Sequence, residues 1–183
     1  MTKSAVGLGL AAALLCAGCA SGPRPFSITE VSPGVFMGVK PRTPAEFDAL
    51  KQHGIRTVLS LERFFWHNWP ERRLAQENGI TYTNVPILAS PLEPSEKRVK
   101  EALLTLAEPS LRPIFMHCLL SEDRTPFIVG LYRVYYEDWS AEEAWREMLH
   151  SKFHASLGMW GFKTYFWKHT EKPGWVTQSQ KSK

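Results

Sequence analysis

Residues 114–127 of the chain read IFMHCLLSEDRTPF, and this stretch decides the fold. An apolar run opens it, and a second apolar run follows from Phe127 to Val134. The first run predicts a short buried strand. The second predicts a helix with Pro126 in its first turn, where proline costs little. Cys118 and Arg124 therefore stand at the two ends of one strand–loop–helix turn.

The residues of this turn favour anion chemistry. A strand–loop–helix turn gathers backbone N–H groups, and the helix N-terminus adds partial positive charge, so the loop is expected to bind an anion and to lower the pKa of the Cys118 thiol. Arg124 offers a fork to two phosphate oxygens. Thr125 can hydrogen-bond the thiolate, and His117 can orient the loop. The other interpretation is that Cys118 is a buried, inert cysteine that acts as a small hydrophobe.

The rest of the chain alternates between strand-like and helix-like segments. Thr43 and Glu46 form a capping box, which predicts a helix start. Ser140 and Glu143 form another. Strands or hairpins are expected at 31–39, 55–61, 80–87 and 114–117, and helices at 43–54, 70–78, 95–107, 125–137, after 140 and within 156–168. This order predicts an α/β fold with a central, mostly parallel sheet flanked by helices, and the 118–124 loop between a buried strand and a helix.

The N-terminus has the pattern of a targeting segment. Lys3 supplies a short positive region, and the apolar run 5–17 is too short to span a membrane but suits a secretory signal. It ends in Cys16-Ala17-Gly18-Cys19, which resembles the bacterial lipoprotein cleavage box. We therefore expect Cys19 to be lipidated and to anchor the protein in the bacterial cell envelope, on the periplasmic side, with Ala20 favouring the outer membrane. The alternative is plain secretion after an Ala-x-Ala-like cut.

The 183 residues have room for one compact domain. We expect a signal peptide at 1–18, a tether at 19–29, the domain at 30–170 and a C-terminal tail at 171–183. If Cys16 is removed and Cys19 is lipidated, Cys118 is the remaining free thiol and has no disulfide partner. The formal net charge is +4 and the charges are spread, so no nucleic-acid partner is expected. The histidines show no metal-ligand spacing, so neither a metal nor another cofactor is expected.

The motif His-Cys-x5-Arg-Thr at 117–125 resembles the signature of the cysteine-dependent protein tyrosine and dual-specificity phosphatases. Residues 38–61, GVKPRTPAEFDALKQHGIRTVLSL, look like the first half of compact bacterial dual-specificity-like phosphatases. Residues 76–87, QENGITYTNVPI, look like the strand that follows, and the resemblance covers roughly residues 30–168. It implies a phosphomonoesterase that works through a phosphocysteine on Cys118, with Arg124 binding the phosphate.

The motif departs from the family at two positions in or beside the loop. The family usually has glycine where Ser121 stands, and often again where Pro126 stands. Glycine at the first position relieves positive φ or crowding against the phosphate, and serine there is expected to cost about 1 kcal/mol. These departures raise the possibility of a weakened or very selective site.

The family's general acid is also missing from its usual place. An aspartate is expected in the loop 87–95, but the chain has none between Asp48 and Asp123. Asp123 is our first candidate for the acid, as in some lipid phosphatases of the superfamily, and Glu93 is the second. A good leaving group would need neither, and Asp123 could instead simply stiffen the loop. The triplet Trp69-Pro70-Glu71 resembles the acid loop of the classical tyrosine phosphatases but comes too early in the chain, so we expect a helix start there.

The substrate is predicted only as a class. The side chains and backbone of the 119–122 segment (Leu119, Leu120, Ser121 and Glu122) are expected to surround the phosphate, with Lys40 and Arg63 as candidate rim cations. Phosphotyrosine in a phosphopeptide and an inositol phosphate are the candidate substrates, and contact with the membrane is expected through the N-terminal lipid only. The alternatives are a phytase-like enzyme specific for inositol hexakisphosphate, a catalytically weak phosphate-binding module, and a structural envelope lipoprotein with a silent Cys118.

Overall fold

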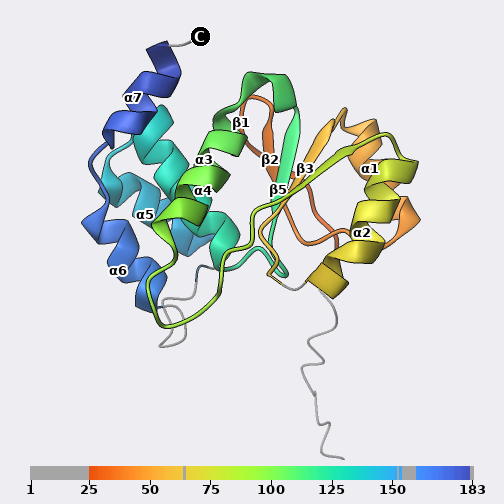
Figure 1. The fold of residues 1–183 in the computed structure, drawn as a ribbon, viewed down its shortest axis with the longest axis horizontal. Helices are drawn as coiled ribbons and strands as arrows, with labels where there is room; N and C mark the ends of the chain where they lie inside the picture. Colours follow the sequence, from red (N-terminus) through yellow and green to blue (C-terminus); the bar gives the residue numbers. More distant parts are fainter. Residues whose placement is uncertain (1–24, 64, 152, 154–159, 182–183) are drawn as a thin grey trace, which may run out of the picture.

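The computed structural model describes residues 25–63, 65–151, 153 and 160–181 (Figure 1). The predicted signal peptide and Cys19 lie outside this part of the chain. None of the helices in it is long and apolar enough to cross a membrane. The elements in chain order are β1 (Thr29–Ser32), β2 (Val35–Met37), α1 (Pro44–Gln52), β3 (Thr57–Ser60), α2 (Phe65–Glu77), β4 (Thr81–Asn84), α3 (Glu96–Ala107), the 3-10 turn η1 (Pro109–Leu111), β5 (Ile114–His117), α4 (Arg124–Tyr136), α5 (Ala141–His150), α6 (Trp160–Lys168) and α7 (Gly174–Lys181).

The five strands form one sheet in the order β1-β2-β5-β3-β4. β1 and β2 are an antiparallel hairpin that turns at Gly34, whose φ of +72° favours glycine. The pairs β2–β5, β5–β3 and β3–β4 are parallel. The expected α/β fold with a mostly parallel sheet is therefore confirmed, and the apolar run before the 118–124 loop is its central strand.

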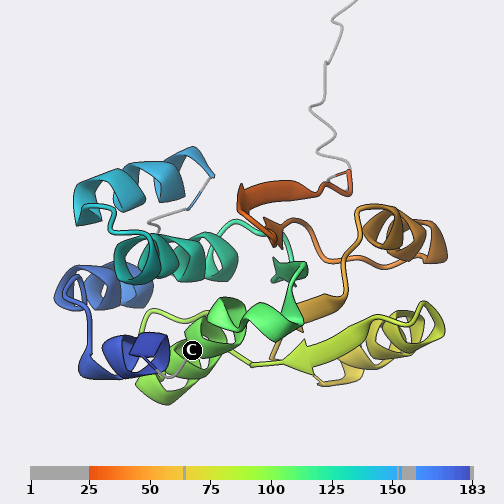
Figure 2. The ribbon, with the colours of Figure 1, turned by 90° about the horizontal axis from the view of Figure 1, so that it is seen from above.

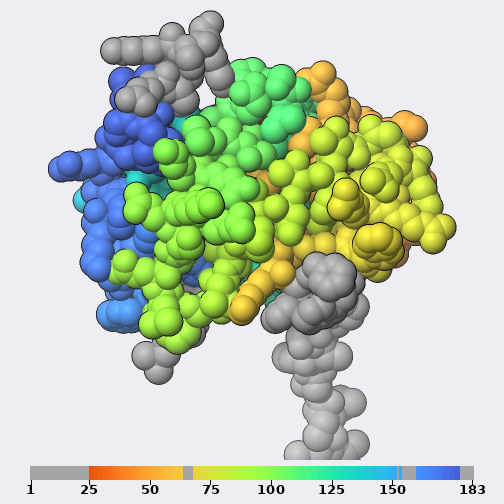
Figure 3. Space-filling view, in the orientation of Figure 1, coloured from red at the N-terminus to blue at the C-terminus, as the bar shows by residue number. Residues whose placement is uncertain are grey.

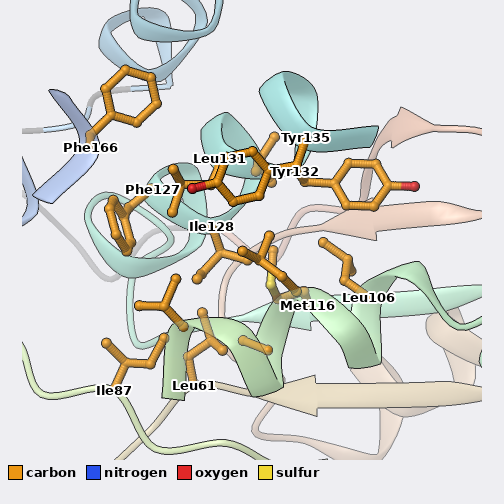
Figure 4. Close-up of a cluster of buried hydrophobic side chains, with 14 of the residues drawn as sticks. Leu61, Ile87, Leu106, Met116, Phe127, Ile128, Leu131, Tyr132, Tyr135 and Phe166 are labelled. Carbon is orange, nitrogen blue, oxygen red and sulfur yellow. The ribbon is translucent and has the colours of Figure 1, made fainter. Parts of the chain in front are cut away.

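The sheet is buried on both faces because its strands carry apolar side chains on both sides. On β5, Phe115 packs with α1 and α2 in one cluster, whereas Ile114 and Met116 belong to the cluster under the other helices. Figure 2 shows α1 and α2 on one side of the sheet and α3 to α7 on the other. The larger cluster includes Met116 and Ile128 between the sheet and α4 (Figure 4). A strand covered on both faces is held firmly, which fixes the loop that follows it.

Helix α4 is buried over almost its whole length. It contacts β5 and is covered on its other sides by α3, α5 and α6. Pro126 lies in its first turn, as predicted. The capping boxes at Thr43 and Ser140 are also confirmed, since each hydroxyl accepts a hydrogen bond from the glutamate N–H three residues on.

Helix α2 begins at Phe65, five residues before the predicted start, and it contains Pro70. The prediction that proline marks the first turn is therefore wrong. Asn68 and Glu71 on this helix are buried and bond to polar groups at the end of the sheet. These inward contacts hold the helix together in spite of the N–H that proline lacks.

The segment 171–183, expected to be a tail, contributes helix α7. Val176 is fully buried, and the ring of Trp175 meets Tyr135 of α4 edge to face, 6.0 Å between centroids. At the other end of the domain, Phe26 of the expected tether packs on Phe115, 6.1 Å between ring centroids. The packed domain therefore extends beyond both predicted boundaries.

Candidate active site

The 118–124 loop lies where the central strand ends and α4 begins, at the lower edge of the sheet in Figure 1. β5 is buried along its whole length between two parallel neighbours. Beyond the strand ends, the backbone N–H of Leu61 donates to the carbonyl oxygen of His117 at 2.9 Å. Ligands of open parallel sheets bind outside the carboxyl ends of the strands. The fold therefore holds the loop at the edge where such a ligand site is expected.

Cys118 is fully buried at the start of the loop, and its thiol donates a hydrogen bond to Oδ1 of Asp123 at 3.1 Å. Burial raises the pKa of the Cys118 thiol, and the negative charge of Asp123 raises it further. The charge of Arg124 and hydrogen bonds from Thr125 act in the opposite direction but do not outweigh them. The expectation of a lowered pKa is therefore wrong for this structure, because burial destabilises the thiolate and a carboxylate inside the loop adds to that effect.

The carboxylate of Asp123 accepts hydrogen bonds from groups that could instead donate to a phosphate oxygen. Its Oδ1 accepts from the backbone N–H of Arg124 at 2.5 Å and lies 3.4 Å from Nε of the same residue. A backbone N–H at a helix start and a guanidinium N–H are typical donors to phosphate oxygens. Asp123 thus places one of its own oxygens where a phosphate oxygen would bind, directly beside the Cys118 thiol.

Arg124 forms a buried ion pair with Glu62, which is not among the site residues predicted from the sequence. Its Nη2 lies 2.9 Å from Oε1 of Glu62, and its Nη1 donates to the carbonyl oxygen of Leu61 at 3.4 Å. Both charged side chains are buried. A buried pair of this kind orients the guanidinium fork. One sequence signal could have found Glu62: it is an acidic residue just after a strand predicted to be buried.

His117 is the middle of a second buried polar chain behind the loop. Its Nδ1 lies 2.9 Å from the carbonyl oxygen of Cys118, and its Nε2 lies 2.5 Å from Oε1 of Glu71. The other carboxylate oxygen of Glu71 pairs with Nζ of Lys40 at 3.1 Å. Burial by itself raises the pKa of Glu71, but the ion pairs with His117 and Lys40 outweigh it and hold that pKa below its ordinary value. Glu71 belongs to the Trp69-Pro70-Glu71 triplet, for which the sequence predicted only a helix start. It contacts the loop from behind through His117.

The rim of the loop differs from the prediction at one position. Lys40 is 7 % exposed and paired with Glu71, so it lies behind the loop and not at its rim. Leu119 and Leu120 are each 40 % exposed, and Glu122 is half-buried. Arg63 is exposed at the same edge, where β3 ends. The surface around the loop is therefore more apolar than the sequence suggested.

Acidic side chains around this edge are paired with cations of the protein itself. Oε1 of Glu93 lies 2.5 Å from Nζ of Lys168 on α6, whereas Asp123 contacts Cys118 directly. Of the two candidate acids, Asp123 is thus the one beside the nucleophile.

No group of three or more histidine, cysteine, aspartate or glutamate side chains among the described residues is arranged to hold a metal ion.

Ser121 has a φ of +54°, in the left-handed region. Of the two reasons expected for a glycine at this position, positive φ and crowding against the phosphate, the structure shows the first. Its hydroxyl donates to the carbonyl oxygen of Gly38 and lies 3.4 Å from Oγ1 of Thr125. These contacts offset the conformational cost of about 1 kcal/mol that a serine incurs there. Gly38 itself cannot carry a Cβ, because the carbonyl oxygen of Ser27 would lie 1.9 Å from it.

No protein-family model and no curated protein matches the chain. Solved structures do resemble it. The catalytic domain of the PP-IP phosphatase SIW14 from S. cerevisiae aligns with a TM-score of 0.69 at 18% identity, over 85% of this chain and 92% of that one. TpbA from P. aeruginosa aligns with a TM-score of 0.65 at 20% identity, over 85% and 89%. A putative phosphatase from Shewanella putrefaciens CN-32 has a TM-score of 0.62 at 15% identity, over 77% and 87%. The chain therefore has the fold of these phosphatases.

Proposed function

We propose that the protein is a cysteine-dependent phosphomonoesterase of the tyrosine and dual-specificity phosphatase type. One observation carries the proposal: the Cys118 thiol, the Asp123 carboxylate and the Arg124 guanidinium converge within one loop. A nucleophile, a proton carrier and a phosphate-binding fork are the groups that the reaction needs. The fold shared with known phosphatases supports the same conclusion.

In the first step, the dianion of a phosphate monoester replaces the Asp123 carboxylate at the donors of Arg124. As the dianion enters, the thiol proton passes to Oδ1 of Asp123 along the hydrogen bond that is 3.1 Å long before binding, and the neutral acid then gives up the donors of Arg124. The Cys118 thiolate attacks phosphorus, so an S–P bond forms as the bond from phosphorus to the ester oxygen breaks. Asp123 gives its proton to the departing oxygen, and an alcohol or phenol leaves.

In the second step, water attacks the phosphocysteine. Asp123, now a carboxylate, takes one proton from the water as its oxygen bonds to phosphorus. The S–P bond breaks, inorganic phosphate leaves, and Cys118 recovers its proton from Asp123. Hydrogen bonds from Thr125 stabilise the thiolate as it is expelled. The net reaction converts the monoester and water to the alcohol and inorganic phosphate.

Positioning provides most of the catalysis in this scheme. Phosphoryl transfer has a loose transition state with charge on the equatorial oxygens, so fixed donors matter more than covalent push. Glu62 fixes Arg124 at 2.9 Å, and His117 joins the loop backbone to Glu71. Glu62 and the His117–Glu71 pair are all buried and lie outside the 118–124 loop. They hold the donors in place before the substrate arrives.

Among water-soluble phosphate monoesters, we propose phosphotyrosine and an inositol phosphate as the first candidate substrates. The yeast neighbour is a PP-IP phosphatase, and TpbA has been solved in complex with pTyr. A phytase-like activity specific for inositol hexakisphosphate is the narrower alternative. The pairing of Lys40 with Glu71 counts against it, because a polyphosphate needs several cations at the rim. A phosphate-binding module without turnover remains the alternative from another class, favoured by the raised thiol pKa.

The test measures phosphate release from an activated aryl phosphate, a phosphotyrosine peptide and inositol hexakisphosphate under reducing conditions. Cys118→Ser and Arg124→Lys are assayed beside the wild type. We expect turnover by the wild type and its loss in Cys118→Ser. Binding of phosphate without turnover on any substrate would identify a binding module. Turnover that survives in Cys118→Ser would refute the cysteine mechanism.

A further inference from the structure

Exposed apolar side chains gather around the 118–124 loop. The described residues include eight large hydrophobic side chains that are exposed. Five of them lie on the loop, on the segment that follows Ile87 or at the start of α6, and we call these the apolar rim: Leu88, Leu92, Leu119, Leu120 and Trp160. Leu92 is 75 % exposed and Trp160 is 52 % exposed. Apolar patches of this kind mark contact with a membrane or a partner.

Backbone contacts place the members of this rim on one edge. The N–H of Ile87 donates to the carbonyl oxygen of Leu61 at 3.2 Å, and Leu61 in turn bonds to His117, so Leu88 follows directly at the edge where the loop lies. The carbonyl oxygen of Leu92 would lie 1.9 Å from a Cβ on Gly161, so the segment 88–95 touches the start of α6, which carries Trp160. Figure 3 shows this segment in lime at the lower edge, beside α6 in blue.

The start of the described chain lies at the same edge. A cavity of about 310 Å³ beside the loop is lined by Pro25 and Ser27 together with Leu120 and Ser121. Pro25 is the sixth residue after Cys19, the expected lipid attachment site. Even fully extended, that length of chain spans only about 20 Å. A lipid on Cys19 would therefore hold the 118–124 loop close to the membrane surface.

We propose that the apolar rim docks on the lipid bilayer and that the substrate is the phosphate monoester headgroup of a membrane lipid. The substrate class rests on the proposed function, whereas the docking does not. Leucines and a tryptophan at one edge, with Nζ of Lys163 5.0 Å from the ring of Trp160, form the mixture of apolar, aromatic and basic groups found at membrane interfaces. The formal net charge of +4 favours a surface rich in anionic lipids.

A lipid headgroup fits this edge better than a polyphosphate does. The phosphate of such a lipid would reach the donors of Arg124 while its acyl chains stay in the bilayer beside Leu119 and Leu120. Lys40, one of the two cations expected at the rim, is buried against Glu71, which leaves Arg63 as the expected cation that is exposed there. Hydrolysis by the two steps above would leave the lipid alcohol in the membrane and release inorganic phosphate into water.

The docking is tested without reference to activity. The full chain, exported with its own leader, is purified in detergent and reconstituted in vesicles of phosphatidylethanolamine and phosphatidylglycerol whose acyl chains are brominated near the headgroup. Bromine quenches tryptophan fluorescence on contact. We expect Trp160→Phe to remove most of the quenching. Trp139→Phe is the matched control, since Trp139 is half-buried beyond the C-terminal end of α4, at the opposite end of that helix from the 118–124 loop, and it should leave the quenching unchanged.

The substrate class is tested with the same preparation. We expect kcat/KM for phosphatidic acid in vesicles to exceed that for its water-soluble dibutyryl analogue by at least about tenfold. The double variant Leu88→Ser/Leu92→Ser should lose this preference and keep its rate on an aryl phosphate, because neither leucine belongs to the catalytic loop.

Four results would overturn the docking or the lipid substrate. A full chain that does not float with vesicles, or one whose quenching Trp160→Phe leaves intact, would rule out the docking. Self-association of the protein that Leu92→Ser abolishes, without quenching, would assign the rim to a second copy. Quenching as expected with equal rates on vesicle and dibutyryl lipid would remove the lipid substrate. Absence of turnover on the aryl phosphate would instead refute the proposed function. The fluorescence quenching would still decide whether the apolar rim docks on the bilayer.

Discussion

The Asp123 carboxylate accepts a hydrogen bond from the thiol of Cys118 at 3.1 Å within the same loop. This contact joins a proton donor and a proton acceptor that both face the expected phosphate site. Under the proposed function, this contact would also explain why the 87–95 loop has no aspartate, because an acid within the 118–124 loop would replace one delivered by a second loop. Asp123 would receive the proton of the nucleophile and pass it to the leaving group.

Asp123→Asn should lower the pKa of the Cys118 thiol. The carboxylate destabilises the nearby thiolate, so removing its charge favours ionisation. The expected result is faster alkylation by iodoacetamide at neutral pH, by about tenfold if the pKa falls by about one unit. The measurement is the pH dependence of the alkylation rate of Cys118. An unchanged or raised pKa would show that Asp123 does not control the thiol.

The same substitution should separate substrates by their leaving groups. An alkyl phosphate needs its leaving oxygen protonated, so Asp123→Asn should reduce kcat on it by about 10² to 10⁴. An aryl phosphate with an acidic phenol should be affected far less. Glu93→Gln is the control, because Glu93 is paired with Lys168, and it should leave both rates near those of the wild type. A large loss of kcat on the alkyl phosphate in Glu93→Gln, with little loss in Asp123→Asn, would instead identify Glu93 as the acid.

Ser121 allows a test of backbone strain in the loop. Ser121→Ala keeps the left-handed φ of +54° and loses the hydroxyl contact with Gly38, so it should be destabilising. Ser121→Gly loses the same contact but relieves the conformational cost. We expect the glycine variant to be more stable than the alanine variant by about 1 kcal/mol in urea unfolding. Equal stabilities would indicate that the loop relaxes when the hydroxyl is removed.

Glu71→Gln should destabilise the protein by about 3 kcal/mol, because it leaves His117 and Lys40 without their buried anion. The folded-state pKa of Glu71 is below its ordinary 4.5, so its stabilising effect is complete above about pH 4.5 and is lost as the pH falls through the lowered value. The deficit of the variant should therefore shrink in acid. Urea unfolding across this pH range measures it.

Glu77→Gln is the matched control for this comparison. Its carboxylate pairs with Arg73 on the same helix, but both side chains are largely exposed. A pair in water contributes little, so the variant should unfold within about 0.5 kcal/mol of the wild type at every pH. A small effect of Glu71→Gln, like that of the control, would mean that the buried chain behind the loop contributes little to stability.

The strand–loop–helix order and the site at its centre could be predicted because local signals carry them. Apolar runs fix β5 and α4, and the spacing of Cys118 and Arg124 identifies the loop. The positive φ at Ser121 followed from the glycine usual at that place. These features depend on residues close together in the chain.

The supports behind the loop could not be predicted, because they depend on contacts between distant segments. Glu62 meets Arg124 only once β3 and β5 are paired. Glu71 meets His117 only because α2 continues through Pro70, which local rules for proline disfavour. The raised pKa of the Cys118 thiol depends first on its complete burial and then on the position of the Asp123 carboxylate, and the sequence alone fixes neither.

The measurement that tests the central claim most directly is a search for the covalent intermediate. The protein is mixed with an aryl phosphate, quenched in acid within milliseconds and digested, and the peptide that contains Cys118 is examined by mass spectrometry. We expect a phosphoryl group on Cys118 in the wild type and its absence in Cys118→Ser. Rapid release of phosphate with no adduct on Cys118 at any quench time, or with the adduct on another residue, would contradict it.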